Sequence, residues 1–174
     1  MKKISAYEIA LSALACALAT LFLTLGVYSG FFLFTAYLAA SIALMLPLCQ
    51  QSWRGYVFAY ISTCLLSLLL ASFRFWEIIP FAMFFGLHPL VNELQLKTKI
   101  NRWVACFIKA LWFDGTVYFT WKVVFAITTS IPFVEKYLIL IILVVGTLLF
   151  IGYDYFMFKW RIWASNLVRR IGKK

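Results

Sequence analysis

The sequence predicts an all-α membrane protein: one domain, residues 1–174, with six transmembrane helices and both termini in the cytoplasm. The 174 residues are 65% hydrophobic and 13% charged, with a mean hydropathy of +0.95, whereas soluble domains are about 45–50% apolar and about 25% charged. In a soluble protein the net charge of +10 would suggest that the protein binds nucleic acid. Here the cations gather in short loops and in the tail, which is typical of membrane topology instead.

Six segments are apolar enough to cross a bilayer, which takes about 20 residues of helix. We expect spans at 4–25, 31–49, 55–72, 78–91, 103–130 and 137–158, followed by a basic amphipathic tail at 159–174. The first span follows two lysines, as in a signal peptide. It lacks a convincing cleavage pattern and is long enough to cross, so we expect a retained helix. The tail is expected to continue the last helix along the inner headgroups.

Small residues form a stripe along the first predicted span. At alternating steps of four and three, one helix face carries Ala6, Ala10, Ala13, Ala17, Thr20 and Thr24. Lipid tails are as apolar as leucine, so membrane helices associate where small residues let their backbones approach closely. The stripe therefore predicts a docking surface, with Ala6, Ala10, Ala13 and Ala17 as the docking residues. The helix that covers it lies either in this chain or in another protein.

The fourth predicted span is short and interrupted. Pro80, Gly86 and Pro89 lie within or at the end of 78–91, which predicts a kink or a tilt. His88 precedes one of these prolines. We interpret it as part of the kink, with a hydrogen-bonded imidazole.

The fifth predicted span carries three ionisable side chains, which are costly in hydrocarbon unless they are paired or hydrated. At about 1.5 Å per residue, Lys109 lies near the inner surface, and we expect it to snorkel there. Asp114 lies near the middle of the bilayer and is expected to pair with a buried donor, either His88 or Lys109. Lys122 lies near the outer surface, where it either faces a cavity or snorkels.

The distribution of cations fixes the predicted orientation. With six spans, 12 of the 16 lysines and arginines fall on one side, and only Arg74 and Lys136 fall on the other. The positive-inside rule makes the rich side cytoplasmic. An odd number of spans would place one basic terminus outside.

No residue pattern points to catalysis. One histidine and six scattered carboxylates form no close pair in the sequence, and motifs for nucleotide binding, zinc proteolysis or serine hydrolysis are absent. The four cysteines lie in or beside apolar runs without a C-x-x-C pair, which is typical of small buried hydrophobes. We therefore expect no enzyme, no cofactor and no metal site.

The predicted outer side is rich in aromatic residues. An interfacial aromatic belt explains many of these rings, but not Arg74, which lies between two phenylalanines on the cation-poor side. Rings that stack on a planar ligand, with cations for an anionic group, would make a small pocket. Its predicted residues are Tyr28, Phe32, Arg74, Trp76, Glu77, Tyr118, Trp121 and Lys122.

The predicted chain resembles the substrate-binding S component of an energy-coupling factor (ECF) transporter in three features. These are a length below 200 residues, six helices with both ends inside, and Ala13-x-x-x-Ala17 in the first helix. The resemblance covers the whole chain as topology, and its only sequence motif is the alanine stripe. It implies that the stripe docks on a transmembrane coupling subunit, which two cytoplasmic ATPases drive. It also implies that a vitamin or related micronutrient binds on the outer side of a multi-pass protein of the bacterial plasma membrane.

Two alternatives remain at this point. The chain could be a non-transporting scaffold subunit of a bacterial membrane or cell-wall complex, which would use the same stripe to hold a partner and would need no ligand pocket. An enzyme that acts on lipid is the other, and would need a catalytic pair that the sequence does not contain.

Overall fold

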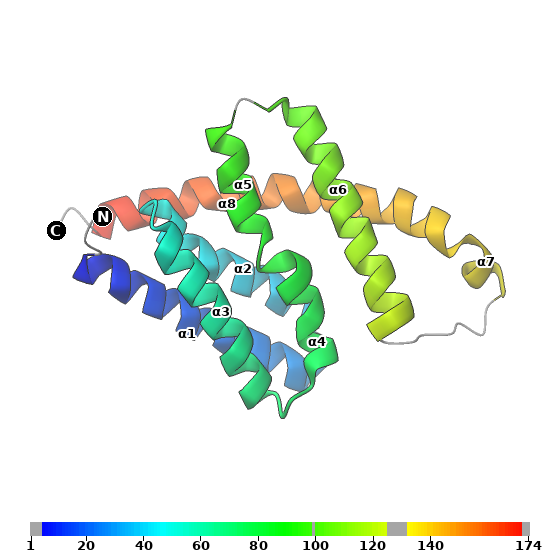
Figure 1. Ribbon diagram of the computed structural model, residues 1–174, viewed down its shortest axis with the longest axis horizontal. Helices are drawn as coiled ribbons and strands as arrows, with labels where there is room; N and C mark the ends of the chain where they lie inside the picture. Colours follow the sequence, from blue (N-terminus) through cyan, green and yellow to red (C-terminus); the bar gives the residue numbers. More distant parts are fainter. Residues whose placement is uncertain (1–4, 99, 125–131, 172–174) are drawn as a thin grey trace.

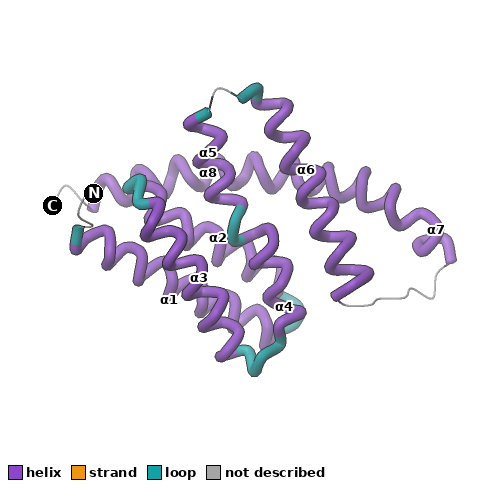
Figure 2. Tube along the Cα trace, viewed as in Figure 1, coloured by secondary structure: helices purple, strands orange, loops and turns teal. Residues whose placement is uncertain are grey.

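The computed structural model describes residues 5–98, 100–124 and 132–171, which form helices and no strands (Figures 1 and 2). The prediction of an all-α fold is therefore confirmed for these residues. The first three helices are α1 (Ala6–Ser29), α2 (Leu33–Cys49) and α3 (Trp53–Leu70). Three longer stretches follow, each with a π-helical segment (η): α4 (Phe75–Pro80), η1 (Phe81–Phe85) and α5 (His88–Lys97); α6 (Arg102–Phe119) and η2 (Thr120–Val124); α7 (Pro132–Ile141), η3 (Ile142–Gly146) and α8 (Thr147–Ile171).

Three of the described helices are long and apolar enough to cross a membrane. They span Ala6–Ser29, Trp53–Leu70 and Lys136–Arg170, and α2 is a shorter apolar helix. Large apolar side chains such as Phe58, Leu148 and Leu149 are more than 60% exposed. An exterior of this kind is consistent with contact with lipid.

Helix α1 packs on α2 and α3 through one face only. Ser5 starts the helix with a capping box, in which its hydroxyl accepts from the Glu8 backbone N–H and the Glu8 carboxylate accepts from the Ser5 N–H, both at 3.1 Å. The buried face carries Leu11, Ala15, Ala19 and Leu23, each four residues after the last. This internal face differs from the face of Ala6, Ala10, Ala13 and Ala17, although Thr20 of the predicted stripe is buried.

The fourth helical stretch is broken, as its prolines and glycine predict. Helix α4 ends at Pro80, the π-helical segment η1 follows, and α5 starts after a turn at Gly86 with Pro89 in its first turn. The helical residues extend over 75–97 rather than the predicted 78–91. Polar residues continue α5 beyond the apolar run as far as its C-cap, Thr98.

Four hydroxyl groups of α2 and α3 satisfy backbone carbonyls of the broken stretch. Hydrogen bonds run from Tyr37 to the carbonyl of Glu77, from Ser41 to Phe85 (2.7 Å), from Tyr56 to Gly86 and from Tyr60 to Ala82 (2.6 Å). Irregular backbone frees carbonyls from their helical donors, and an unsatisfied carbonyl costs several kcal/mol where water is absent. The hydroxyls therefore make the break possible in a buried place.

Replacing Tyr56 by Phe is expected to lower the free energy of unfolding by about 1–3 kcal/mol, because the Gly86 carbonyl would stay buried without its donor. Unfolding of the detergent-solubilised protein by sodium dodecyl sulfate measures the change. Tyr155→Phe removes a hydroxyl from a ring that is 62% exposed and is the matched control, with an expected change below about 0.5 kcal/mol. Equal losses in both variants would contradict this role for Tyr56.

Helix α8 is continuous from Thr147 to Ile171 and runs along the length of the molecule (Figure 1). Residues 159–171 of the predicted tail thus continue the last helix, as expected. One face of this segment packs on the protein, because Ala164 and Val168 are buried and the Tyr7 hydroxyl donates to the Val168 carbonyl at 3.4 Å. This contact brings the start of α1 and the end of α8 together at one end of the fold. The segment's expected position along the inner headgroups stays a prediction.

Candidate functional site

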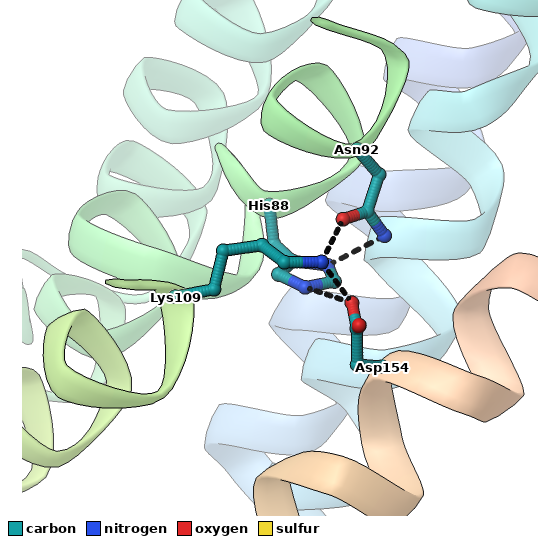
Figure 3. Close-up of polar contacts among 4 residues, drawn as sticks. All are labelled: His88, Asn92, Lys109 and Asp154. Carbon is teal, nitrogen blue, oxygen red and sulfur yellow. Dashed lines mark hydrogen bonds and ion pairs between the residues drawn. The ribbon is translucent and has the colours of Figure 1, made fainter. Parts of the chain in front are cut away.

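Four polar side chains from α5, α6 and α8 form a buried cluster: His88, Asn92, Lys109 and Asp154 (Figure 3). Lys109 Nζ donates to Asp154 Oδ1 at 2.6 Å and to Asn92 Oδ1 at 2.8 Å. His88 Nε2 lies 3.0 Å from the same Asp154 oxygen, and its Nδ1 lies 3.5 Å from Asn92 Nδ2. The cluster joins the consecutive helices α5 and α6 to α8, which comes much later in the sequence.

The cluster corrects two expectations. Lys109 does not snorkel: it is 2% exposed and pairs with Asp154. The partner of His88 and Lys109 is Asp154 rather than Asp114, because α8 crosses α5 and α6 at this level. The expectation of a hydrogen-bonded His88 beside the kink is confirmed.

The buried cluster acts as a structural clamp. Lys109 and Asp154 neutralise each other, while His88 and Asn92 use their polar atoms within the cluster. The rings of Phe84, Phe150 and Tyr153 surround His88, with Tyr153 closest at 4.6 Å between centroids. None of the four polar residues lines either of the two cavities described below.

A second ion pair joins α5 to α8. Arg161 Nε and Nη2 donate to both carboxylate oxygens of Glu93 at 2.7–3.0 Å, and Glu93 is 4% exposed. Such a bidentate contact fixes the orientation of both side chains. In the sequence, Arg161 is one of the cations of the basic tail, and no pattern there pairs it with Glu93.

Asp114 holds α6 against the last helix through a hydroxyl. Thr147 Oγ1 donates to Asp114 Oδ2 at 2.8 Å, and a Cβ on Gly146 would lie 2.5 Å from Oδ1. Glycine at position 146 therefore permits the close approach. Asp114 therefore makes an internal contact, as expected, but its donor is Thr147 and not His88 or Lys109.

An aromatic pocket of about 440 Å³ lies between α2, η1 and α6–η2. Its lining residues are Gly30, Phe31, Leu33, Phe34, Tyr37, Pro80, Phe84, Phe85, Phe113, Thr116, Val117, Thr120 and Trp121. Two of its polar atoms, Thr120 Oγ1 and Trp121 Nε1, are buried and have no hydrogen-bond partner among the described residues. We refer to it as the aromatic pocket.

Of the eight predicted binding residues, Trp121 lines the aromatic pocket. Arg74 lies 3.9 Å from Glu77 and 5.8 Å from the centre of the Tyr28 ring, and the Tyr28 hydroxyl donates to the Leu70 carbonyl. Arg74 therefore contacts both Glu77 and Tyr28, and none of these three residues lines the aromatic pocket. The remaining predicted residues are Phe32, Trp76 and Tyr118, which are exposed, and Lys122, which is in η2.

The alanine stripe remains open on the surface. Ala6, Ala10, Ala13 and Ala17 are exposed, whereas Thr20 is buried and Thr24 is half-buried. Ala13 and Ala17 line an apolar groove of about 550 Å³ between α1 and α3. Gly55, which also lines the groove, lets α3 approach α1 closely, because a Cβ there would lie 2.3 Å from Ser12 Oγ. Within the described chain, no helix covers the four alanines.

Comparisons of this chain with known protein families, with curated proteins and with solved structures find no match. The stripe and the aromatic pocket are therefore the features of the described chain that bear on its function.

Proposed function

We propose that the chain is the substrate-binding membrane subunit, similar to an S component, of an ECF-type importer for a vitamin or related micronutrient. One observation carries this proposal. Helix α1 uses the face of Ala15 and Ala19 for its own fold and leaves the face of Ala13 and Ala17 exposed. A protein that needed the stripe only for its own packing would cover it.

The groove beside the stripe favours a helical partner. Its lining is mostly apolar, and the small residues Ala13, Ala17 and Ala59 in that lining allow a second backbone to approach. A coupling helix of the transmembrane partner would fill this groove. The energy would come from the two cytoplasmic ATPases that the partner carries.

The proposal includes six membrane crossings with both termini in the cytoplasm. The contact between Tyr7 and Val168 supports it, because an even number of crossings returns the chain to its starting side. The basic residues of the tail support the cytoplasmic side. The aromatic pocket, between the start of α2 and the end of α6, then opens on the outer half, where an importer receives its ligand.

The test is the substitution of Ala13 by Leu, alone and with Ala17→Leu. We expect an unchanged fold and a roughly 5- to 150-fold weaker association with the coupling subunit, because each leucine adds bulk where two backbones meet. Co-purification of the chain with the coupling subunit and both ATPases, and uptake by cells, measure the effect. Native mass spectrometry of the gently purified chain then checks for a bound small molecule.

Ala15→Leu is the matched control, two residues away on the same helix. Ala15 is fully buried against the rest of the chain, so the same change should unfold the protein in detergent. An equal loss of stability in Ala13→Leu would mean that the stripe packs internally. Retained association without any bound or bindable small molecule would favour the scaffold subunit.

A further inference from the structure

We propose that the aromatic pocket takes an uncharged planar ligand whose hydrogen-bond acceptor points to Thr120 and Trp121. The inference rests on the proposed function and names the chemical class of the ligand. It differs from the anionic ligand that the sequence suggested, because Arg74 and Glu77 contact each other outside the pocket.

The shape of the pocket favours flat rings. Phe34 and Phe85 meet edge to face at 5.6 Å, Tyr37 stacks on Phe85 at 5.2 Å, and Phe84 meets Phe113 at 5.0 Å. Offset stacking and edge contacts with such rings stabilise a planar π system beyond the area it buries. The volume of about 440 Å³ lies within the range of small-molecule sites.

The electrostatics of the lining favour a ligand without charge. The lining residues carry no ammonium, guanidinium or carboxylate group, and the Tyr37 hydroxyl already donates to the Glu77 carbonyl. A carboxylate moved from water into such a lining would lose its hydration without gaining a counter-ion. A neutral ligand avoids that cost.

Two buried polar groups define the polar end of the ligand. Thr120 is 9% exposed, and its hydroxyl has no hydrogen-bond partner among the described residues. The indole N–H of Trp121 also has no partner among them. Buried polar groups are nearly always hydrogen-bonded in folded proteins, and an indole N–H can only donate. A ligand carbonyl or ring nitrogen would accept from Trp121, with Thr120 as a second contact.

The backbone of the pocket is already fixed before a ligand arrives. Ser41 Oγ holds the Phe85 carbonyl at 2.7 Å, and Tyr37 holds the Glu77 carbonyl, so the break in the fourth helical stretch is held from α2. Phe84 and Phe85, which face the pocket, are buried among other rings. A preformed wall reduces the entropy cost of binding.

Three probes of similar size test the ligand class. 7-Methoxycoumarin is planar and uncharged and carries a carbonyl acceptor; 2-methoxynaphthalene lacks the acceptor; coumarin-3-carboxylate adds a negative charge. Equilibrium dialysis of the full chain in detergent, with protein-free micelles as the blank, gives each affinity. We expect 7-methoxycoumarin to bind at least about tenfold more tightly than coumarin-3-carboxylate.

Two variants assign binding to the pocket. Trp121→Phe keeps a ring and removes the N–H, so 7-methoxycoumarin should weaken about 3- to 10-fold while 2-methoxynaphthalene is unchanged. Val117→Trp fills the pocket and should abolish binding of both uncharged probes. Val104→Trp, on an exposed position of the same helix, is the control and should change neither.

Several outcomes would overturn the proposed ligand class. These are no binding of 7-methoxycoumarin up to its solubility, tighter binding of coumarin-3-carboxylate that Arg74→Met weakens, or no effect of Val117→Trp. A co-purified phospholipid that 7-methoxycoumarin does not displace would make the occupant an acyl chain, which also overturns it. If co-purification with the coupling subunit still depends on Ala13 in any of these cases, the importer role stands and only the ligand class fails. If co-purification no longer depends on Ala13 while the probes still bind as expected, the ligand class stands and the importer role fails.

Discussion

Replacing Asp154 by Asn is expected to lower the free energy of unfolding by about 3–5 kcal/mol. Lys109 would keep its charge in a buried place without its counter-ion, and removing one partner of a buried pair is costly for that reason. Titration of the solubilised protein with sodium dodecyl sulfate, followed by far-ultraviolet circular dichroism, gives the change. Arg74→Met breaks the half-exposed pair with Glu77 and is the control, with an expected loss of at most about 1 kcal/mol.

The double variant Lys109→Met/Asp154→Leu tests the cause. If the buried charge is responsible, an apolar pair should recover most of the lost stability, because neither charge then remains without a partner. A double variant as unstable as Asp154→Asn would show instead that the shape of the buried cluster, including His88 and Asn92, matters more than its charge.

Replacing Arg161 by Met is the second change with a large expected effect, again about 3–5 kcal/mol. Glu93 is 4% exposed in the unaltered protein, and its carboxylate would lose both of the nitrogens that now donate to it. The same unfolding titration measures the loss. Arg161→Lys keeps the charge but not the bidentate geometry, so its stability should lie between those of Arg161→Met and the unaltered protein. Equal stability of all three proteins would mean that the pair contributes nothing.

Features that depend on local chemistry could be predicted from the sequence. Pro80, Gly86 and Pro89 act within their own helical stretch, and the break occurs where they stand. The periodicity of small residues identified one face of α1, and Ala13 and Ala17 on that face are exposed. The number of crossings and their orientation stay predictions.

Contacts between distant helices could not be predicted in the same way. Asp154 follows Lys109 by 45 positions and His88 by 66. Nothing in the spacing of these residues tells which helix faces meet, because the crossing of α8 over α5 and α6 decides it. A carboxylate within an apolar run was the available signal for Asp154, since such a group needs a partner. The same signal existed at Asp114, and the sequence offered no means to choose between them.

The aromatic pocket was only partly visible in the sequence. Trp121 is among the eight predicted residues, but five of the eight belong to the aromatic turns outside the lining: Tyr28, Phe32, Arg74, Trp76 and Glu77. The rings that form most of the lining, such as Phe84 and Phe113, lie within apolar runs. There, a phenylalanine that packs in the core and one that faces a cavity give the same pattern.

The hydroxyl contacts to the broken helical stretch also bear on the order in which the protein is made. The donors lie at positions 37, 41, 56 and 60, and the carbonyls that they satisfy belong to positions 77, 82, 85 and 86. Synthesis from the N-terminus therefore delivers every donor before its acceptor. When residues 75–97 leave the ribosome, some of their carbonyls lack helical donors. The hydroxyl groups that satisfy these carbonyls belong to α2 and α3, which have already been synthesised.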